Sequence, residues 1–402
     1  MRTTTTTIMT ATRTMRSTSS ILLVLLATAS AFCPLTVSRR PLSFLTLSTS
    51  STTTTTSTFT ADSFESAYQH AEATLTAAMP NNPNLLQPLL HFTKEYMTAN
   101  EMAYQATLHP SNAPEATCHR ILTGIKLGMT YGMGPNKYPF GATHKAVRDL
   151  DGIDFYKFGC DFFRSVIADT VVLGHFDKAM ELLNMGHNVV FLANHQSEAD
   201  PQVMSVCLEK AGFHDAAEKM TYVAGHKVTT DALAIPFSMG RNLICIHSKK
   251  HLDADPETKP MKQKQNLQAM SEMLGLLKQG GTALWVAPSG GRDRRDLTTG
   301  KVPIAKFDSK TIDMFRLMGN KSKQPTHYFP LAMVSYDLCP PPDYVEAGTG
   351  EQRNVRYSAV GISCGEELIS AGGLEHRHEF CEAAEQRCQD DYEALLKHMN
   401  ME

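Results

Sequence analysis

Between residue 137 and the C-terminus, short apolar runs alternate with longer segments of helical spacing, and this alternation restricts the fold more than any other feature. The short runs are rich in β-branched and aromatic residues and predict strands. Strand–helix alternation favours an α/β domain over residues 137–402, with a mixed sheet flanked by helices. The predicted strands are Asn188–Ala193, Met220–Ala224, Asn242–His247, Thr282–Ala287, Tyr328–Val334 and Val355–Gly361, and the predicted helices are 176–185, 201–212, 232–239, 260–279 and 371–398.

Residues 62–136 carry only helical signals and predict a small N-terminal helical domain. An apolar stripe with helical spacing begins at Phe64, and Ser63 is placed to cap that helix. Two more helix-like segments follow near 88–99 and 115–131, separated by prolines. The larger α/β domain therefore follows a smaller helical one.

The first 61 residues differ in composition from the rest of the chain. They contain five Arg, no Lys, no Asp or Glu, and 30 Ser or Thr. Such a stretch buries too little apolar surface to offset the entropy cost of ordering, so we expect it to be disordered. Basic residues, a short apolar run and Ala-Ser-Ala predict a signal peptide over residues 1–31, and the acid-free residues 32–61 have transit-peptide composition.

The junction Ala-Ser-Ala-Phe-x-Pro resembles the bipartite leaders of algae with secondary plastids and predicts delivery to the plastid stroma. The alternative is a secretory signal followed by a Ser/Thr-rich stalk. Nine Cys without a CxxC pair suggest neither a zinc site nor a disulfide framework, which fits a reducing compartment.

Composition also excludes some classes of protein. No stretch approaches the roughly 20 apolar residues of a transmembrane helix, so we expect no membrane span. The near-neutral balance of 38 basic and 41 acidic residues argues against a nucleic-acid binder.

Three histidines are followed by an aspartate five residues later, and their context separates them. His195 directly follows the most strand-like run, at a position where ligand-binding loops collect in α/β proteins. Asp200 precedes Pro201 at the start of a predicted helix, where Asp is a favoured N-cap. A His on a loop and an Asp at the helix start would meet, which makes this pair the catalytic candidate. The other pairs are His144/Asp149, expected on a solvated helix face, and His226/Asp231, which could line a pocket.

Two basic motifs lie just beyond predicted strands. Lys250 and His251 follow one strand, and Arg292 and Arg294 follow another after two glycines. Arg recognises phosphate through two parallel hydrogen bonds, and Lys adds a point charge. Both motifs follow strands of one predicted sheet, which favours a shared phosphate site. The alternative is that each motif is a set of solvated loop charges.

The segment 361–365 reads Gly-Ile-Ser-Cys-Gly and matches the nucleophile-elbow pattern of serine hydrolases. Ser363 would be the nucleophile, with Asp390 and His398 as the remaining triad candidates on one helical run. A serine hydrolase therefore stays open as an alternative function.

Four longer blocks carry a resemblance to a known family. One reads Asn-His-Gln-Ser-Glu-Ala-Asp-Pro around His195, and another reads Pro-Ser-Gly-Gly-Arg-Asp-Arg up to Arg294. In sequence, order and separation the blocks resemble the soluble plastid glycerol-3-phosphate acyltransferase family. The blocks are residues 186–201, 236–251, 285–294 and 329–337.

The resemblance implies transfer of a fatty acyl chain from acyl carrier protein to the sn-1 hydroxyl of glycerol 3-phosphate. The product would be 1-acyl-sn-glycerol 3-phosphate, made in the first step of plastid glycerolipid synthesis. The implied catalytic pair is His195 and Asp200, and the implied phosphate site is Lys250, His251, Arg292 and Arg294.

The chemistry of these residues agrees with that reading. A thioester is already an activated acyl donor, so the enzyme needs a base for the hydroxyl proton and no metal or cofactor. His195 can act as that base, with Asp200 orienting its ring. A non-catalytic lipid- or carrier-binding protein is the remaining alternative.

The predicted helix 260–279 has two distinct features. An apolar stripe of Leu267, Met270, Leu274 and Leu277 predicts the face that packs on the protein. Lys259, Lys262 and Lys264 gather at the helix start. They form a candidate docking patch for the acidic carrier protein, or else a solvated helix end.

Overall fold

The computed structural model describes residues 61–248, 252, 255–342, 352–369 and 376–401. These described residues form one compact unit. The signal and transit segments predicted for residues 1–61 lie outside the described residues except for Ala61, and so do Lys250 and His251.

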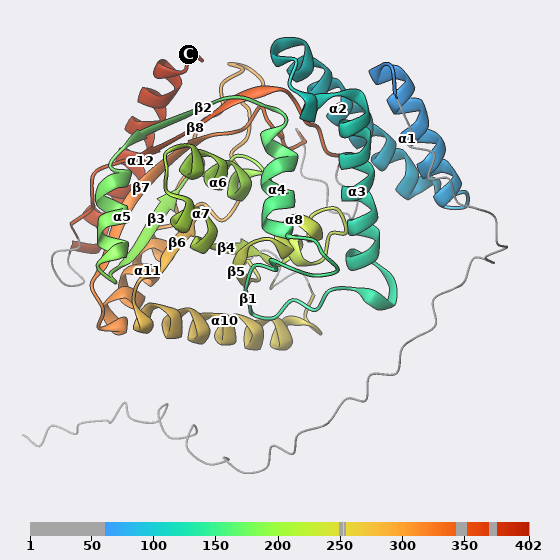
Figure 1. The fold of residues 1–402 in the computed structure, drawn as a ribbon. Helices are drawn as coiled ribbons and strands as arrows, with labels where there is room; N and C mark the ends of the chain where they lie inside the picture. Colours follow the sequence, from blue (N-terminus) through green and yellow to red (C-terminus); the bar gives the residue numbers. More distant parts are fainter. Residues whose placement is uncertain (1–60, 249–251, 253–254, 343–351, 370–375, 402) are drawn as a thin grey trace, which may run out of the picture. The chain divides into compact units, whose positions relative to one another are not determined.

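Among the described residues, eight strands form one mixed sheet in the order β1-β5-β4-β6-β3-β7-β8-β2 (Figure 1). Strand β3 lies inside the sheet and pairs in parallel with β6 on one side and β7 on the other. The mixed sheet with flanking helices confirms the predicted fold class. The strands are β1 (Thr143–His144), β2 (Ile167–Gly174), β3 (Asn188–Ala193), β4 (Thr221–Gly225), β5 (Asn242–Ile246), β6 (Ala283–Val286), β7 (Thr326–Val334) and β8 (Ser358–Cys364).

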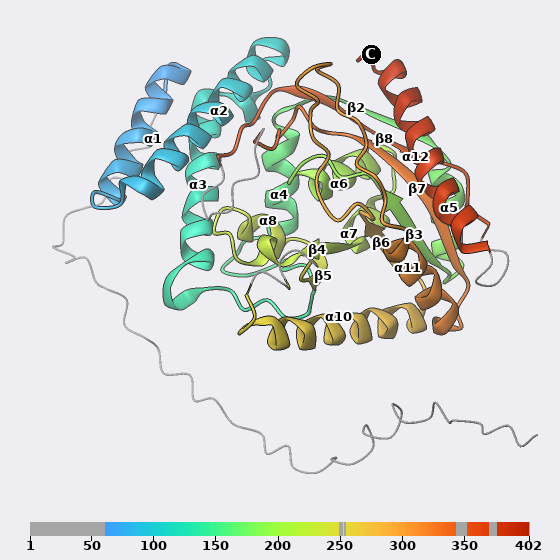
Figure 2. The same ribbon diagram turned by 180° about the vertical axis from the view of Figure 1, so that it is seen from behind.

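Helices cover both faces of the sheet (Figures 1 and 2). All six side chains of β3 are buried. Val189, Phe191 and Ala193 join the core that includes α5 and α6, whereas Val190 and Leu192 join the core of α10, α11 and α12. This twofold alternation is what a strand buried on both faces produces. The helices of the α/β part are α4 (Phe155–Arg164), α5 (Phe176–Asn184), α6 (Asp200–Lys210), α7 (His214–Lys219), α8 (Ile235–Met239), α10 (Lys259–Gln279), α11 (Ser309–Ser322) and α12 (Arg377–His398), with a 3₁₀ turn η3 (His226–Thr229).

Three helices precede the sheet, as the sequence predicts. They are α1 (Phe64–Ala78), α2 (Pro83–Thr107) and α3 (Pro114–Gly132), with a short 3₁₀ turn at Pro110–Asn112 between α2 and α3 and another at Gly134–Asn136 after α3. The predicted cap at Ser63 is confirmed, because its hydroxyl accepts a hydrogen bond from the Ser66 amide at 3.2 Å.

These helices pack directly on the α/β part. The Tyr96 ring of α2 stacks on Phe162 of α4 with centroids 4.1 Å apart. Helix α3 comes close to the segment before α8, where a Cβ atom on Gly132 would lie 2.6 Å from the Ala232 Cα. Glycine is therefore required at that crossing. The boundary predicted at residue 136 stays a prediction.

The direction of each strand decides which loops share an edge of the sheet. Strands β3, β4, β5, β6 and β7 are parallel neighbours, so their C-terminal ends lie at one edge. Strand β8 is antiparallel to β7, so it begins at that edge and ends at the other. We call the edge that carries the C-terminal ends of β3–β7 the carboxyl edge. Ligand-binding loops gather at such an edge in open α/β sheets.

The sequence patterns do not predict every strand and helix of the structure. Strands β1 and β2 and helices α4, α7 and α11 were not predicted. Strand β8 begins three residues later than predicted, at Ser358. The predicted apolar face of α10 is also partly wrong, because Leu267 is 72% exposed while Ala269, Met273 and Leu277 are buried.

Candidate active site

The loop that leaves β3 at the carboxyl edge brings His195 and Asp200 together. His195 Nδ1 lies 2.7 Å from Asp200 Oδ2. The Asp200 side chain is fully buried, whereas 27% of the His195 side chain is exposed. A ring whose Nδ1–H donates to a carboxylate keeps Nε2 as its basic nitrogen.

The Asp200 carboxylate is enclosed by donors. Oδ2 also accepts the Gln196 amide at 2.8 Å, and Oδ1 accepts the Ser197 amide at 3.1 Å and the Ser197 hydroxyl at 3.0 Å. The Ser335 hydroxyl donates to Oδ1 as well. Burial would raise the pKa of Asp200, but the hydrogen bonds from His195, Ser335 and Gln196 and the charge of His195 outweigh it and lower this pKa. Asp200 is therefore held as a carboxylate beside His195.

The prediction that Asp200 is the helix N-cap is wrong. Ala199 occupies the N-cap position without a side-chain cap bond, and Asp200 is the first helical residue with Pro201 next to it. Its carboxylate turns back toward the preceding loop rather than toward the helix amides. Competition from the loop amides and His195 explains the difference.

Two amide side chains that flank His195 fix this loop to the end of β7. Asn194 Oδ1 accepts the Met333 amide at 2.7 Å, and its Nδ2 donates to the Met333 carbonyl at 3.1 Å. Gln196 Oε1 accepts the Ser335 amide at 2.8 Å. The T-shaped contact between His195 and Trp285, with centroids 5.6 Å apart, supports the ring from β6. Sequence analysis assigned no role to these residues.

The loop after β6 adjoins the histidine. The Asp293 amide donates to the His195 carbonyl at 2.6 Å, and the buried Asp293 carboxylate accepts Asn194 Nδ2 at 3.0 Å and the Ala305 amide at 2.8 Å. Burial raises the pKa of Asp293 to about 6, although both hydrogen bonds oppose the rise. Asp293 thus couples the two loops.

Arg292 and Arg294 flank Asp293 in this loop. Arg292 Nη1 lies 3.6 Å from Glu198 Oε1, and the Arg292 side chain is 14% exposed. Arg294 Nη1 donates to the Pro342 carbonyl at 2.7 Å. Both arginines thus lie on a loop that is hydrogen-bonded to the histidine loop.

The rest of the predicted phosphate site cannot be placed, since Lys250 and His251 lie outside the described residues. The strand that precedes them is fixed to α10. The His247 amide donates to Asn266 Oδ1 at 2.7 Å, and Asn266 Nδ2 donates back to the His247 carbonyl at 2.9 Å. This end of β5 lies at the carboxyl edge.

Sequence analysis missed Arg353 and Glu198. Arg353 Nε donates to Glu198 Oε2 at 2.9 Å, and Arg353 Nη2 lies 3.0 Å from Asp231 Oδ2. Arg353 reaches the carboxyl edge because it precedes β8, which is antiparallel to β7. A residue that precedes a strand reaches this edge only where that strand runs antiparallel to its neighbour. Glu198 could have been found from the sequence, because it lies between the candidate residues His195 and Asp200.

The other two His/Asp pairs do not form. His144 lies on β1, not on a solvated helix face, and its Nε2 is 3.1 Å from the Met239 carbonyl. Burial lowers the pKa of His144. His226 contacts Thr229, and its ring is tilted against that of His247 with centroids 4.3 Å apart, whereas Asp231 pairs with Arg353.

The nucleophile-elbow hypothesis is wrong. Ser363 is a buried residue inside β8, paired with Leu173 and Ala332, rather than on a strand-to-helix turn. Asp390 and His398 are exposed on α12. The serine of the G-x-S-x-G motif lies within a strand, so the motif supplies no nucleophile.

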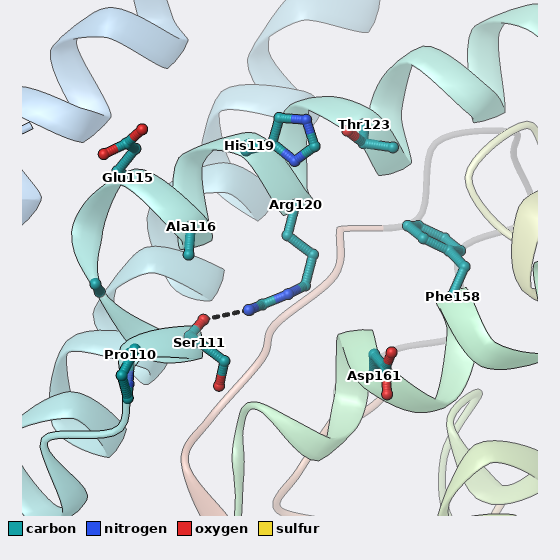
Figure 3. Close-up of a pocket in the computed structure, with 10 residues that line it drawn as sticks. Pro110, Ser111, Glu115, Ala116, His119, Arg120, Thr123, Phe158 and Asp161 are labelled. Atoms are coloured by element: carbon teal, nitrogen blue, oxygen red, sulfur yellow. Dashed lines mark hydrogen bonds between the residues drawn. The ribbon is translucent and has the colours of Figure 1, made fainter. Parts of the chain in front are cut away.

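A separate cleft of about 630 Å³ lies beside α3 and α4. Figure 3 shows Arg120 directed toward the Ser111 carbonyl, with Phe158 and Asp161 on the other wall. His119 and Thr123 also line it. It contains no predicted site residue.

Within the described part of the chain, no group of three or more His, Cys, Asp or Glu side chains is arranged to hold a metal. The described helices include none that is both long and apolar enough to cross a bilayer.

Comparison with known protein families identifies the class of domain that this chain contains. The model of the acyltransferase family matches residues 176–334, from the start of α5 to the end of β7. This span includes His195, Asp200, Arg292 and Arg294. The chain therefore carries an acyltransferase domain.

Curated relatives give a narrower group. The chain is 40% identical over 256 residues to the chloroplastic glycerol-3-phosphate acyltransferase of Arabidopsis thaliana, covering 62% of this chain and 52% of that protein. It is 44% identical over 230 residues to the chloroplastic glycerol-3-phosphate acyltransferase ATS11 of Cucurbita moschata, covering 56% and 51%. The resemblance found in the sequence is confirmed, and the chain spans about half the length of these relatives.

One solved structure is also similar: the 1-acyl-sn-glycerophosphate (LPA) acyltransferase PlsC from Thermotoga maritima. Sequence identity is 18% and the TM-score 0.36, over 60% of this chain and 79% of that one.

Proposed function

We propose that this chain is a glycerol-3-phosphate 1-O-acyltransferase that uses acyl carrier protein as its acyl donor. The observation that carries the proposal is the His195–Asp200 hydrogen bond of 2.7 Å at the carboxyl edge, beside the loop of Arg292 and Arg294. The chloroplastic relatives support glycerol 3-phosphate as the acceptor.

The proposed reaction is a direct transfer. His195 Nε2 accepts the proton of the sn-1 hydroxyl while the hydroxyl oxygen attacks the thioester carbon. The new C–O bond forms, the C–S bond breaks, and the imidazolium returns the proton to the carrier thiolate. Buried Asp200 holds the ring orientation and stabilises the imidazolium.

Arg292 and Arg294 form the proposed phosphate site together with Lys250 and His251. Arginine suits a dianionic phosphate because its planar guanidinium can donate two parallel hydrogen bonds. The backbone bond from Asp293 to His195 links the arginine loop to the catalytic loop. Phosphate held there would orient the glycerol hydroxyls toward the histidine.

For the carrier protein we propose a docking surface on α10, defined as Lys259, Lys262, Lys264, Met261 and Leu267. Met261 is 53% exposed and Leu267 is 72% exposed, and Lys264 is exposed between them. Apolar side chains among lysines suit an acidic partner that also offers apolar contacts. We further propose the plastid stroma as the location, reached through residues 1–61.

The test is a turnover assay with the full-length chain. Acyl carrier protein loaded with a fatty acid and glycerol 3-phosphate should give 1-acyl-sn-glycerol 3-phosphate, measured by mass spectrometry with regiochemical analysis. Binding of both substrates without product would instead identify a non-catalytic lipid- or carrier-binding protein. Product acylated only at the sn-2 position would contradict the proposed regiochemistry.

A further inference from the structure

Four charged side chains form a cluster beside the proposed phosphate site, which we call the Arg353 cluster: Arg353, Glu198, Asp231 and Arg292. Glu198 lies between the two arginines, 2.9 Å from Arg353 Nε and 3.6 Å from Arg292 Nη1. Asp231 contacts Arg353 at 3.0 Å. The shorter distances show that Arg353 is the principal partner of Glu198.

The cluster is sheltered from water. The exposed fractions of the side chains are 8% for Arg353, 7% for Asp231, 14% for Arg292 and 26% for Glu198. Charges interact more strongly in such surroundings than in solvent. Burial would raise the pKa of Glu198, but the charges of Arg353 and Arg292 outweigh it and lower this pKa. Glu198 is therefore a carboxylate.

A carboxylate beside Arg292 competes with any phosphate that Arg292 binds. Both anions use the same guanidinium donors, and each opposes the other through like-charge repulsion. Glu198 lies in the short loop between His195 and Asp200, and this position brings its carboxylate within 3.6 Å of Arg292. The competition is relieved only if another cation takes most of the Glu198 charge. Arg353 is the nearest such cation.

Arg353 is itself fixed from two sides. Its Nε donates to Glu198 Oε2 at 2.9 Å and its Nη2 to Glu198 Oε1 at 3.5 Å, and Nη2 also lies 3.0 Å from Asp231 Oδ2 after β4. A planar guanidinium suits this double contact, and a lysine would not reproduce it.

We propose that Arg353 is a positioning residue of the phosphate site: it binds Glu198 and so prevents this carboxylate from competing with phosphate for Arg292. This role rests on the proposed function. It predicts opposite effects of the two partners on glycerol 3-phosphate binding, which a purely structural ion pair would not produce.

The experiment measures steady-state kinetics of full-length variants with glycerol 3-phosphate as the varied substrate. Arg353→Gln should raise the KM for glycerol 3-phosphate by about tenfold or more, with a much smaller change in kcat. Glu198→Gln should lower this KM by about threefold, because it removes the competing anion. The double variant should recover most of the loss caused by Arg353→Gln. Arg356→Gln, three residues away and 57% exposed, is the matched control and should leave the KM unchanged.

Several outcomes would overturn the proposal. An unchanged KM in folded Arg353→Gln would do so, as would a double variant no better than that single variant. Glu198→Gln remains informative if Arg353→Gln fails to fold, and a raised KM in Glu198→Gln would exclude competition. The variant Arg292→Gln distinguishes failure of the proposed phosphate site from failure of the positioning role of Arg353. If its KM is also unchanged, the phosphate site is wrong; if only Arg353→Gln is unaffected, the phosphate site stands and the positioning role fails.

Discussion

At the scale of single residues, the strongest prediction concerns Asp200. Its carboxylate accepts hydrogen bonds from His195, Gln196, Ser197 and Ser335. We expect Asp200→Asn to lower kcat by about 10⁴-fold through loss of the imidazolium's counter-charge. The Asn amide would also face backbone and hydroxyl donors, at about 1–3 kcal/mol for each donor left unpaired. Thermal unfolding should therefore show reduced stability alongside the kinetic loss.

His195→Ala separates catalysis from that structural cost. It should abolish acyl transfer while the protein stays folded, as judged by circular dichroism. His226→Ala is its control, since His226 lies at the same edge but contacts Thr229 and not Asp231. Normal turnover in folded His195→Ala would refute the mechanism.

The two neighbouring arginines after Asp293 should behave differently. Arg294→Ala should raise the KM for glycerol 3-phosphate by about 10- to 150-fold, the equivalent of about 1.5–3 kcal/mol for a charge-assisted contact. Arg295 instead pairs with Asp337 at 2.6 Å and lies over the Tyr336 ring at 4.9 Å. Arg295→Ala should lower the melting temperature and leave this KM unchanged. Equal KM values in wild type and Arg294→Ala would remove Arg294 from the phosphate site.

At the scale of elements, α12 carries a pH-dependent cost at Asp391. Its Oδ2 is buried without a hydrogen-bond partner, and burial followed by the charge of Asp390 raises the pKa of Asp391 to about 6. Because the folded state prefers the protonated form, the stability this preference contributes is present below about pH 4 and is lost as pH rises through 6. Asp391→Asn should raise the melting temperature at pH 7.5 but not at pH 3.8. An equal effect at both pH values would contradict this assignment.

Helix α10 offers a test of carrier docking. Lys264→Glu should raise the KM for acyl carrier protein and weaken its dependence on salt, because it reverses an exposed charge on the docking surface. Lys278→Glu, also exposed but at the far end of the same helix, is the matched control. Identical salt dependence in both variants would exclude this surface.

Apolar runs in the sequence predict some strands and helices of this fold and miss others. Strands β3, β5, β6 and β7 could be predicted because they are mostly buried on both faces and read as continuous apolar segments. Strand β2 was missed because it lies at the sheet edge with several exposed residues, which removes the continuous signal. Leu267 was misplaced because an apolar residue at helical spacing need not face the core.

Some of the site residues can likewise be found from the sequence, and others cannot. His195, Asp200, Arg292 and Arg294 could be found because each follows a strand that ends at the carboxyl edge. Arg353 could not, since its position depends on the antiparallel pairing of β7 and β8. Sequence periodicity predicts strands but not their directions.

At the scale of the whole molecule, the leader predicts a route to the plastid. A reporter fused to residues 1–61 should reach the stroma of a secondary plastid, and replacement of Phe32 by Ala should halt it at the plastid boundary. Fluorescence microscopy distinguishes these outcomes. Secretion of the reporter, or its retention in the cytosol, would contradict the prediction.

The reversed direction of β8 also sets an order of assembly during synthesis. Glu198 and its partner Arg353 are 155 residues apart along the chain. A nascent chain that has emerged only as far as β7 already contains His195, Asp200, Arg292 and Arg294. It still lacks Arg353, so under the proposed role of that residue the phosphate site is completed only after the segment that follows β7 has been synthesised.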